Sequence, residues 1–315
     1  MIILEGAESF PKQSYTVVTI GTFDGVHVGH QEILKKIVNQ AKDNNGVSVV
    51  VTFWPHPRFV LQGVEESGLK LLNTFEEKSA SLAEQGIDYL IKIPFTKEFS
   101  QTTSDEFIRK ILIDQLGTTH LVIGYDHHFG KDREGSFEYL QAHIDEYGFT
   151  LQEIPRQDID DVGVSSTKIR NALSKGEVDM AKSYLGKNYA ISGDVIHGEK
   201  LGRKIGYPTA NVRLSEPYKM IPANGIYAVK VFLENKIAFG MLYIGTKPTL
   251  TGDSVRVIEV NIFDFNDDIY DQQIRLEFLK YIRDDMKFED LDQLTNQITK
   301  DKEVTLDILK HYPND

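Results

Sequence analysis

The stretch Gly21–His30, GTFDGVHVGH, lies between an apolar, β-branched run at residues 15–20 and a segment of helical spacing at residues 31–42. Its glycines allow a tight turn and a close approach of the backbone to a ligand. The helix that follows offers unpaired N–H groups and the positive end of its dipole. His27 and His30 are three residues apart, so they share one face of the first turn. Such a strand-to-helix junction suits a bound phosphate.

Short β-branched runs and amphipathic segments alternate around this junction. The runs are residues 16–20, 47–53, 88–93, 120–124 and 150–154, and the amphipathic segments lie near 31–42, 75–85, 104–116 and 134–147. This alternation predicts βαβ units, that is, a Rossmann-like α/β domain whose parallel sheet carries helices on both faces. Sheets of this kind bind ligands beyond the carboxyl ends of their strands.

The pattern changes after Gly186. Residues 188–197, 225–233, 236–244, 255–265 and 272–282 have the composition of strands, separated by Gly, Pro, Asn and Asp turns without helices between them. These segments predict a small antiparallel β-barrel, and residues 291–309 return to helical spacing as a terminal helix. We therefore expect two domains, residues 1–186 and 187–315, which agrees with a length of 315 residues.

Charge and composition narrow the possible partners and the compartment. The 35 basic residues against 47 acidic ones give a net charge of −12, which argues against a nucleic-acid or anionic-membrane partner. The absence of cysteine excludes disulfides and thiolate metal sites. No apolar run has the length of a membrane span, and no signal-peptide pattern is visible, so the sequence predicts a cytoplasmic protein. It does not indicate the oligomeric state.

Five of the nine histidines follow predicted strands: His27, His30, His56, His127 and His128. Because the carboxyl ends of parallel strands share one edge, these side chains are expected to converge there. A single histidine near a helix start is most often a surface or capping residue. The HxxH spacing could also bind a metal, together with Asp126, His127 and His128. The histidines taken together favour a site.

Four motifs occur in a characteristic order: GTFDGVHVGH, then TFWPHP at 52–57, GYDHHFG at 124–130 and SSTKIR at 165–170. In this order the chain resembles the adenylyltransferase module of prokaryotic bifunctional riboflavin kinase/FAD synthetases, within the group of HxGH nucleotidyltransferases. The resemblance implies transfer of AMP from ATP to FMN, which gives FAD and pyrophosphate. The FMN phosphate is already ionised near neutral pH, so the site must align phosphates but needs no general base.

The resemblance also implies the residues of the adenylyltransferase site. Those that contact ATP or its phosphates are Gly21, Phe23, Asp24, His27, His30, Asp126, Ser165, Ser166, Thr167 and Arg170. Among them His30 is expected to act in catalysis at the α/β bridge, and Arg170 to face the departing pyrophosphate. Ser165 or Ser166 can cap the following helix, which is also the plain structural reading of SSTKIR. His56 is expected near the flavin or as part of a structural turn, and His127 stands where relatives usually carry an aromatic residue.

The run GDVIHGEKLGRKIGYPTAN at residues 193–211 is a second candidate phosphate site. It lacks the GxxxxGK[ST] pattern, so it is not a Walker A loop. Glycines and cations can still wrap phosphates, although such a loop can also be a mobile turn. The phosphate-binding candidates are Gly198, Lys200, Gly202, Arg203 and Gly206. In extended backbone Thr209 and Asn211 project to the same side, and their oxygens could hold Mg²⁺.

This run resembles the riboflavin kinase signature, and the match continues through NGIYAV at 224–229, IGTKPT at 244–249, VIEVNIFDF at 257–265 and IRDDMKF at 282–288. Glu259 occupies the catalytic position, and the 5′-hydroxyl of riboflavin needs a carboxylate base because its proton must leave. A glutamate within a strand is otherwise usually solvent-facing. Arg283 is expected on the flavin side, with a surface salt bridge as the alternative. Two departures are Tyr243 before Ile244 and Asp271 in place of a usual glycine.

The sequence therefore predicts one bifunctional enzyme that phosphorylates riboflavin and adenylylates FMN. Its partners are riboflavin, FMN, FAD and ATP as co-substrate, with Mg²⁺ as cofactor. Two alternatives stay open. One is a riboflavin kinase with a degenerate adenylyltransferase domain, which the histidine at position 127 would favour. The other is a flavin-binding regulator without turnover, which has no need of Glu259.

Overall fold

The structure is a computed structural model that describes residues 1–124, 128–154, 163–198, 202, 205–234, 236–248 and 254–312. The chain divides into two compact units, Met1–Ser166 and Thr167–Asp315. This division falls before residue 186, where the sequence places the domain boundary. Within the described ranges, no helix combines the length and the apolar character needed to cross a membrane.

The first unit is built on a six-stranded parallel sheet, which confirms the predicted Rossmann-like α/β class. The order is β1-β4-β3-β2-β5-β6, and every neighbouring pair is parallel. The strands are β1 (Ile2–Glu5), β2 (Thr16–Ile20), β3 (Val47–Trp54), β4 (Tyr89–Pro94), β5 (His120–Gly124) and β6 (Thr150–Ile154). The carboxyl ends of these strands therefore share one edge.

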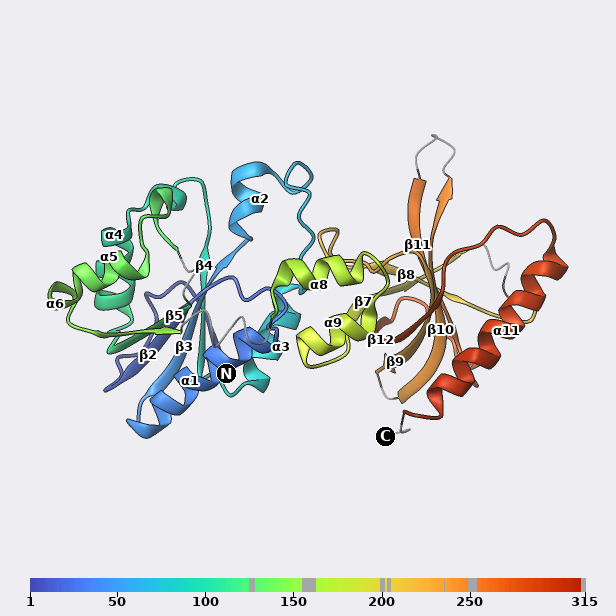
Figure 1. Cartoon of the computed structure of the whole chain (residues 1–315), viewed down its shortest axis with the longest axis horizontal. Coiled ribbons are helices and arrows are strands. Elements are labelled where there is room, and N and C mark those ends of the chain that lie inside the picture. The colour runs from blue at the N-terminus through green and yellow to red at the C-terminus, as the bar shows by residue number, and fades with distance from the viewer. Residues whose placement is uncertain are drawn as a thin grey trace. The chain divides into compact units, whose positions relative to one another are not determined.

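Helices cover both faces of this sheet (Figure 1). The helices of this unit are α1 (Val28–Asp43), α2 (Pro57–Gln62), α3 (Phe75–Glu84), α4 (Ser104–Phe107), α5 (Phe137–Ala142) and α6 (Ile144–Tyr147), with a π-helix, η2, at Ile108–Gln115 and 3₁₀ turns η1 (Phe99–Gln101) and η3 (Lys131–Arg133), and α2 lies beyond the end of β3. Alternate strand residues enter two separate cores, because successive side chains point to opposite faces. Val17 packs in the core that contains α1 and α3, and Val18 packs in the core that contains Phe107 and Leu112.

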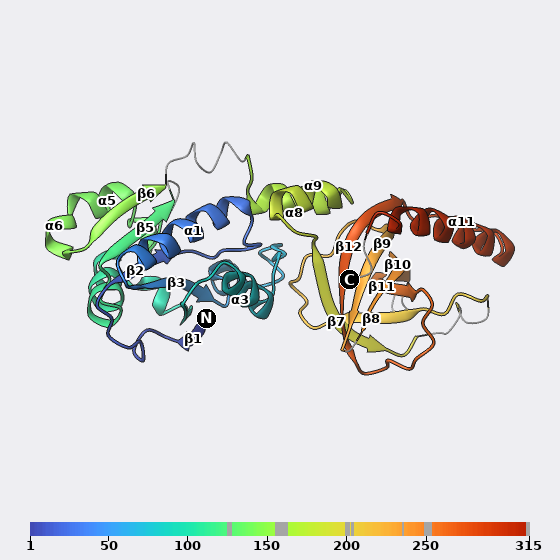
Figure 2. The ribbon, with the colours of Figure 1, turned by 90° about the horizontal axis from the view of Figure 1, so that it is seen from below.

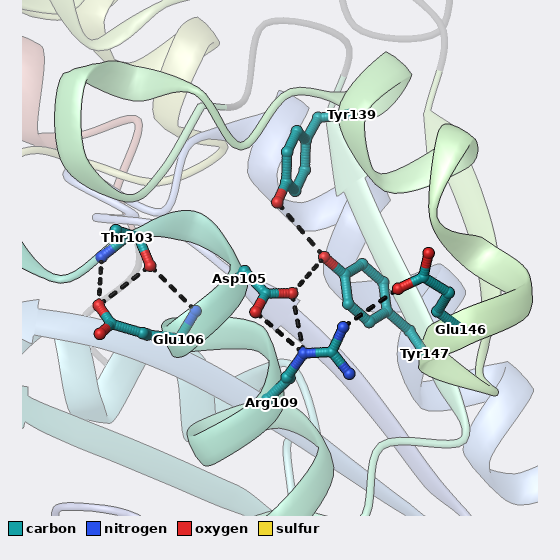
Figure 3. A network of polar contacts seen from close by, with 7 residues as sticks. All are labelled: Thr103, Asp105, Glu106, Arg109, Tyr139, Glu146 and Tyr147. Carbon is teal, nitrogen blue, oxygen red and sulfur yellow. Dashed lines mark hydrogen bonds and ion pairs between the residues drawn. The ribbon is translucent and has the colours of Figure 1, made fainter.

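A polar network joins α4, η2 and α6, which pack on the face of the sheet that carries Val18 (Figure 3). Arg109 Nε donates to the Asp105 carboxylate at 2.9 Å, and Arg109 Nη2 lies 3.1 Å from Glu146 Oε2. The hydroxyl of Tyr147 donates to Asp105 Oδ1 at 3.1 Å. The hydrogen bond from Arg109 is the main cause of the lowered pKa of Asp105. The network therefore joins α4 and the π-helix to α6.

The second unit contains a closed antiparallel barrel with the order β10-β11-β8-β7-β12-β9, as the sequence predicts. Its strands are β7 (Ala190–Ile196), β8 (Ala210–Leu214), β9 (Gly225–Leu233), β10 (Lys236–Pro248), β11 (Ser254–Ile262) and β12 (Gln273–Arg283). Helices α8 (Ser166–Leu173) and α9 (Val178–Leu185) precede the barrel, and α9 ends at Gly186, whose φ is +73°. The terminal helix α11 (Leu291–Leu309) lies along β9, β10 and β12 (Figure 2).

Candidate active sites

The two imidazoles of the HxGH motif are stacked on each other at the start of α1. Their ring centroids are 3.6 Å apart with an interplanar angle of 13°. His27 is the N-cap residue, and its Nδ1 accepts a hydrogen bond from the backbone N–H of His30 at 3.3 Å. The Nδ1 atom of His30 is buried and has no hydrogen-bond partner among the described residues. A buried polar atom without a partner is uncommon and marks a place where a ligand can bind.

Both imidazoles are neutral at pH 7. Burial lowers the pKa of His27 to about 4. Burial also lowers the pKa of His30 well below its ordinary value, and the neighbouring His27 and Lys78 lower it further. A neutral imidazole has one N–H donor and one acceptor and carries no charge. The pair can therefore direct hydrogen bonds to phosphate oxygens, but the balancing positive charge must come from other groups.

The loop that leads into α1 has a strained backbone. Phe23 and Val26 have φ angles of +45° and +42°, although neither is glycine. The left-handed region costs a β-branched residue the most, and such strain clusters at functional sites. Both side chains are buried, and the Phe23 ring centroid lies 5.1 Å from that of His30. A Cβ on Gly21 would lie 2.9 Å from the Phe23 ring, so a side chain at this position would displace that ring.

Asp24 fastens this loop to two other segments of the first unit. Its Oδ1 accepts hydrogen bonds from the backbone N–H groups of Leu72, at 2.9 Å, and Asn73, at 3.3 Å. Its backbone carbonyl accepts a hydrogen bond from Ser166 Oγ at 2.8 Å. The structure therefore brings GTFDGVHVGH and the start of SSTKIR together. Through this contact Ser166 is held against the loop that leads into α1.

The remaining residues predicted for the first site divide into three cases. Ser165 directly precedes α8, while Thr167 and Arg170 lie within its first two turns. His56 is the N-cap of α2 and accepts a hydrogen bond from the Arg58 N–H at 3.2 Å, which is the structural turn that the sequence left as an alternative. Asp126 and His127 lie outside the described residues. Among the described residues no cluster of three or more His, Asp or Glu could hold a metal.

The second candidate site surrounds Glu259 on β11. The strand register pairs Glu259 with Asn211 of β8 on one side and Tyr243 of β10 on the other. Glu259 Oε2 accepts a hydrogen bond from Thr209 Oγ1 at 3.1 Å, and Oε1 lies 2.8 Å from Lys247 Nζ. The Glu259 side chain is only 18% exposed. It is therefore a partly buried, positioned carboxylate and not a solvent-facing one.

The segment around Thr209 is held next to β11 by a second side chain. Asn261 Nδ2 donates to the Pro208 carbonyl at 2.6 Å. Gly198 allows Asn211 to approach, because a Cβ there would lie 2.2 Å from Asn211 Nδ2. The other two candidate glycines lie in the same loop: Gly202, whose carbonyl accepts the Tyr207 N–H at 2.8 Å, and Gly206, whose φ is +84°. Lys200 and Arg203, the predicted phosphate-binding cations, are outside the described residues.

Arg283 takes part in an ion pair within the second unit. Its Nε lies 2.9 Å from Asp301 Oδ1, and its Nη2 lies 2.6 Å from Asp301 Oδ2. The Asp301 side chain is 3% exposed, so this pair is buried and is not a surface salt bridge. It joins the end of β12 to α11. A contact between Arg283 and a flavin stays a prediction.

Sequence reasoning missed two lysines that the structure places at these sites. Lys247 pairs with Glu259 as described above. Lys78 of α3 is buried, with its Nζ 5.1 Å from the centroid of the Trp54 ring. The one available signal for Lys78 is its spacing, because it lies three residues after Phe75 and four before Leu82 on the apolar side of α3.

Comparison with known proteins gives consistent matches for both halves. Residues 9–168 match the family described as FAD synthetase, and residues 185–309 match the family described as riboflavin kinase. Two curated relatives carry the name bifunctional riboflavin kinase/FMN adenylyltransferase. The one from Pseudomonas fluorescens is 37% identical over 92% of this chain and 92% of its own. The one from Haemophilus influenzae is 39% identical over 91% of this chain and 92% of its own.

A solved structure matches most of the chain. It is titled as a macrolide-efflux protein from Streptococcus pneumoniae and has a TM-score of 0.86 and 33% sequence identity. The match covers 96% of this chain and 98% of that one. The two chains therefore share both folds.

Proposed function

The chain belongs to the family of bifunctional riboflavin kinases and FMN adenylyltransferases, and we propose from this premise how its residues divide the two reactions. It converts riboflavin to FMN and FMN to FAD. In our proposal residues 187–315 perform the first step and residues 1–186 the second. The observation that carries this division is the presence of two differently built sites. One is a pair of neutral imidazoles, and the other is a carboxylate held by a hydroxyl and an ammonium.

Adenylyl transfer uses the first site. An oxygen of the FMN phosphate attacks the α-phosphorus of ATP, the bond from that phosphorus to the bridging oxygen breaks, and pyrophosphate leaves with the electron pair. His30 donates a hydrogen bond near the bridging oxygen, and the Nδ1 atom of His27 holds His30 in place by accepting its backbone N–H. Gly21, Phe23 and Asp24 shape the loop that holds the triphosphate.

The start of α8 completes this proposal for the first site. Ser165, Ser166 and Thr167 offer hydroxyl groups and helix N-terminal N–H groups to the phosphates. Arg170 balances the charge on the departing pyrophosphate. Asp126 contributes a polar contact to the nucleotide, and His56 contacts the flavin.

Riboflavin phosphorylation uses the second site. Glu259 accepts the proton of the riboflavin 5′-hydroxyl while that oxygen attacks the γ-phosphorus of ATP, and ADP leaves. The hydrogen bond from Thr209 and the ion pair with Lys247 keep the carboxylate in one orientation. The loop with Gly198, Lys200, Gly202, Arg203 and Gly206 holds the ATP phosphates, and Arg283 orders the flavin side.

Thr209 and Asn211 would hold Mg²⁺ in the kinase site. The donor set fits this ion, because a hydroxyl and an amide oxygen beside a carboxylate supply the hard oxygen ligands that Mg²⁺ prefers. When bound, the ion neutralises charge on the β- and γ-phosphates. We further propose a cytoplasmic location, because a sequence without cysteine fits a reducing compartment. From the net charge of −12 we propose that no nucleic acid or membrane is a partner.

A product assay tests the proposal. The full chain is incubated with riboflavin, ATP and Mg²⁺, and flavins are separated by chromatography while ADP and pyrophosphate are measured. We expect FMN first and FAD later, with ADP and pyrophosphate in step, and no product when EDTA is present. FMN without FAD would leave a kinase with a degenerate first domain. Tight flavin binding without ADP or pyrophosphate would instead indicate a regulator.

A further inference from the structure

Lys78 is a buried cation for which the described part of the chain provides no direct polar partner. Its residue exposure is 3%. Among the described residues, no acceptor lies within hydrogen-bond distance of its Nζ and no carboxylate within ion-pair distance. The contact that the ammonium does make is with the Trp54 ring, at 5.1 Å from the centroid. A buried charge is costly unless it is paired, so an ammonium in this state is prepared for an anion.

The position of Lys78 is next to the imidazole pair of the first site. Trp54 ends β3, and the parallel register of β2 and β3 places it beyond the same edge as the Gly21–His30 stretch. Asp24 of that stretch receives hydrogen bonds from the two residues that precede the Thr74 N-cap of α3. The first turns of α3, which carry Lys78, are therefore fastened to the loop before α1.

Electrostatic interactions agree with this placement. The positive charge of Lys78 contributes to the lowered pKa of His30. Burial lowers the pKa of Lys78 itself to about 8, and the nearby Asp24 acts in the opposite direction. The titratable groups that interact with Lys78 are thus Asp24 and the imidazole of His30. Glu77, its neighbour on α3, is engaged by the backbone N–H of Thr74 at 2.9 Å.

We propose that the Lys78 ammonium binds a phosphate oxygen of the nucleotide substrates during adenylyl transfer, beside the imidazoles of His27 and His30. This inference rests on the proposed assignment of that reaction to the first domain. The imidazoles are uncharged at pH 7, so they can orient a phosphate but cannot neutralise it. Lys78 supplies the missing charge, and the bound phosphate gives the ammonium the anionic partner that the described residues do not provide.

The test uses the full chain with Lys78→Met, which keeps the length of the side chain and removes its charge. The rate of FAD formation is measured with ATP and FMN varied separately. We expect kcat/KM for adenylyl transfer to fall by about 30-fold, as for the loss of one charge-assisted hydrogen bond. A rise of KM for ATP alone assigns the contact to the ATP phosphates, and a rise for FMN alone assigns it to the FMN phosphate.

Two controls accompany the measurement on Lys78→Met. Riboflavin phosphorylation by the same variant should be unchanged, which shows that the second domain is folded. A cooperative urea transition in the fluorescence of Trp54 shows that the first domain is folded as well. Lys92→Met is a matched variant, because Lys92 lies near the same helix, 4.5 Å from the Phe75 ring, but already has Glu5 as a partner at 2.9 Å. Its FAD synthesis should stay close to that of the wild type.

The pH dependence of FAD synthesis distinguishes phosphate binding by Lys78 from a purely structural role of this residue. Wild-type FAD synthesis should decline above pH 8 as the ammonium loses its proton. In Lys78→Arg this decline should move to higher pH, since a guanidinium stays charged. FAD synthesis by Lys78→Met within threefold of wild type, or an unchanged profile in Lys78→Arg, overturns the inference. Wild-type protein that forms no FAD at all overturns the proposed function instead.

Discussion

At the scale of single residues, replacement of the proposed base Glu259 should distinguish the two reactions. Glu259→Gln keeps the size of the side chain and the hydrogen bond with Thr209 but removes the base, so we expect FMN formation to fall by about 10²- to 10⁴-fold. FAD formation from supplied FMN should be nearly unchanged, because that reaction needs no base. Chromatography of flavin products from both substrates makes the comparison. Loss of both activities would contradict separate sites.

His27 makes the stability of the first unit depend on pH. Its pKa is about 4 in the folded protein and about 6.5 in the unfolded chain. As pH falls below 6.5 the His27 imidazole becomes protonated in the unfolded chain but stays neutral in the folded protein. Protonation therefore stabilises the unfolded chain, and the free energy of unfolding decreases. The decrease due to this residue should be about 2 kcal/mol at pH 5 and should level off below about pH 4.

Urea denaturation at pH 7, 6 and 5 measures this effect, with the fluorescence of Trp54, the one tryptophan of the sequence, reporting on the first unit. The control is His27→Asn, which retains a side-chain hydrogen-bond acceptor at the N-cap but does not titrate. The loss of stability between pH 7 and pH 5 should be smaller in this variant. Equal losses in both proteins would show that His27 is not the cause.

Asp271 is one of the two departures from the riboflavin kinase signature, and the structure gives a physical reason for a glycine at this position. Its φ is +60°, in the left-handed region that favours glycine. Asp271→Gly should therefore raise the free energy of unfolding by up to about 1 kcal/mol. Asp267→Gly is the matched control: Asp267 has no positive φ, so the added freedom of the unfolded chain should be neutral or destabilising. Thermal unfolding of both variants measures the change in Tm, and equal changes in Tm would contradict the explanation by the positive φ of Asp271.

The sequence revealed some site residues better than others. His27, His30 and Thr209 were identifiable as candidates because they occur within motifs whose spacing has a chemical meaning, and Glu259 because the resemblance to the riboflavin kinase signature implies a catalytic role for it. Lys78 was not, because a lysine after two glutamates in a helix is typical of a solvent-facing position. Its burial depends on Trp54 and Asp24, which are distant in sequence.

At the scale of elements, the ion pair between Arg283 and Asp301 attaches α11 to the barrel. Asp301→Ala leaves the guanidinium with its charge uncompensated in a largely buried place, so we expect a loss of about 3–5 kcal/mol in the free energy of unfolding. Asp307→Ala on the same helix removes an exposed pair with Lys310, whose side chains are both 73% exposed, and should have almost no effect. Chemical denaturation followed by loss of kinase activity measures both, and similar losses would contradict the role of the buried pair.

Elements with buried β-branched residues were predictable almost to the residue. The structure has β2, β5 and β6 at the ranges that the sequence indicates. The strands β1 and β8 were missed, because β1 is largely exposed and β8 contains polar residues of the PTAN segment. Both are strands because of distant partners, β4 for β1 and β7 and β11 for β8. The π-helix was also missed, since apolar spacing does not distinguish it from an α-helix over eight residues.

At the scale of the whole molecule, the two candidate sites lie on two separate hydrogen-bonded sheet systems, and this predicts complementation in a mixture. Glu259→Gln should use FMN but not riboflavin, and His30→Asn should make FMN but little FAD. Mixed together with riboflavin and ATP, the two variants should form FAD after a lag, because FMN released by one can be used by the other. Chromatography over time provides the measurement. Only FMN in the mixture, although each variant keeps its remaining activity, would contradict this exchange.

The sequence predicts the large-scale plan because the order of strands and helices determines which sites can form. A parallel sheet gathers the ends of β2, β3 and β5 at one edge, so the motifs that follow them had to lie near one another. The contact of Asp24 with the segment before α3 could not be predicted, because it depends on loop geometry. The position of the boundary between the two functional domains also stays a prediction, since the first compact unit of the structure ends at residue 166.

The barrel and the open sheet differ in whether they have edge strands that can pair with another molecule at high protein concentration. A ring of strands has no terminal member to which a foreign strand could add, whereas the open sheet ends at β1 and β6. On β1 the residues Ile2 and Ile3 are 53% and 44% exposed. Edges of this kind are templates for intermolecular pairing. Aggregation of the folded protein through strand addition is therefore expected to start in the N-terminal half.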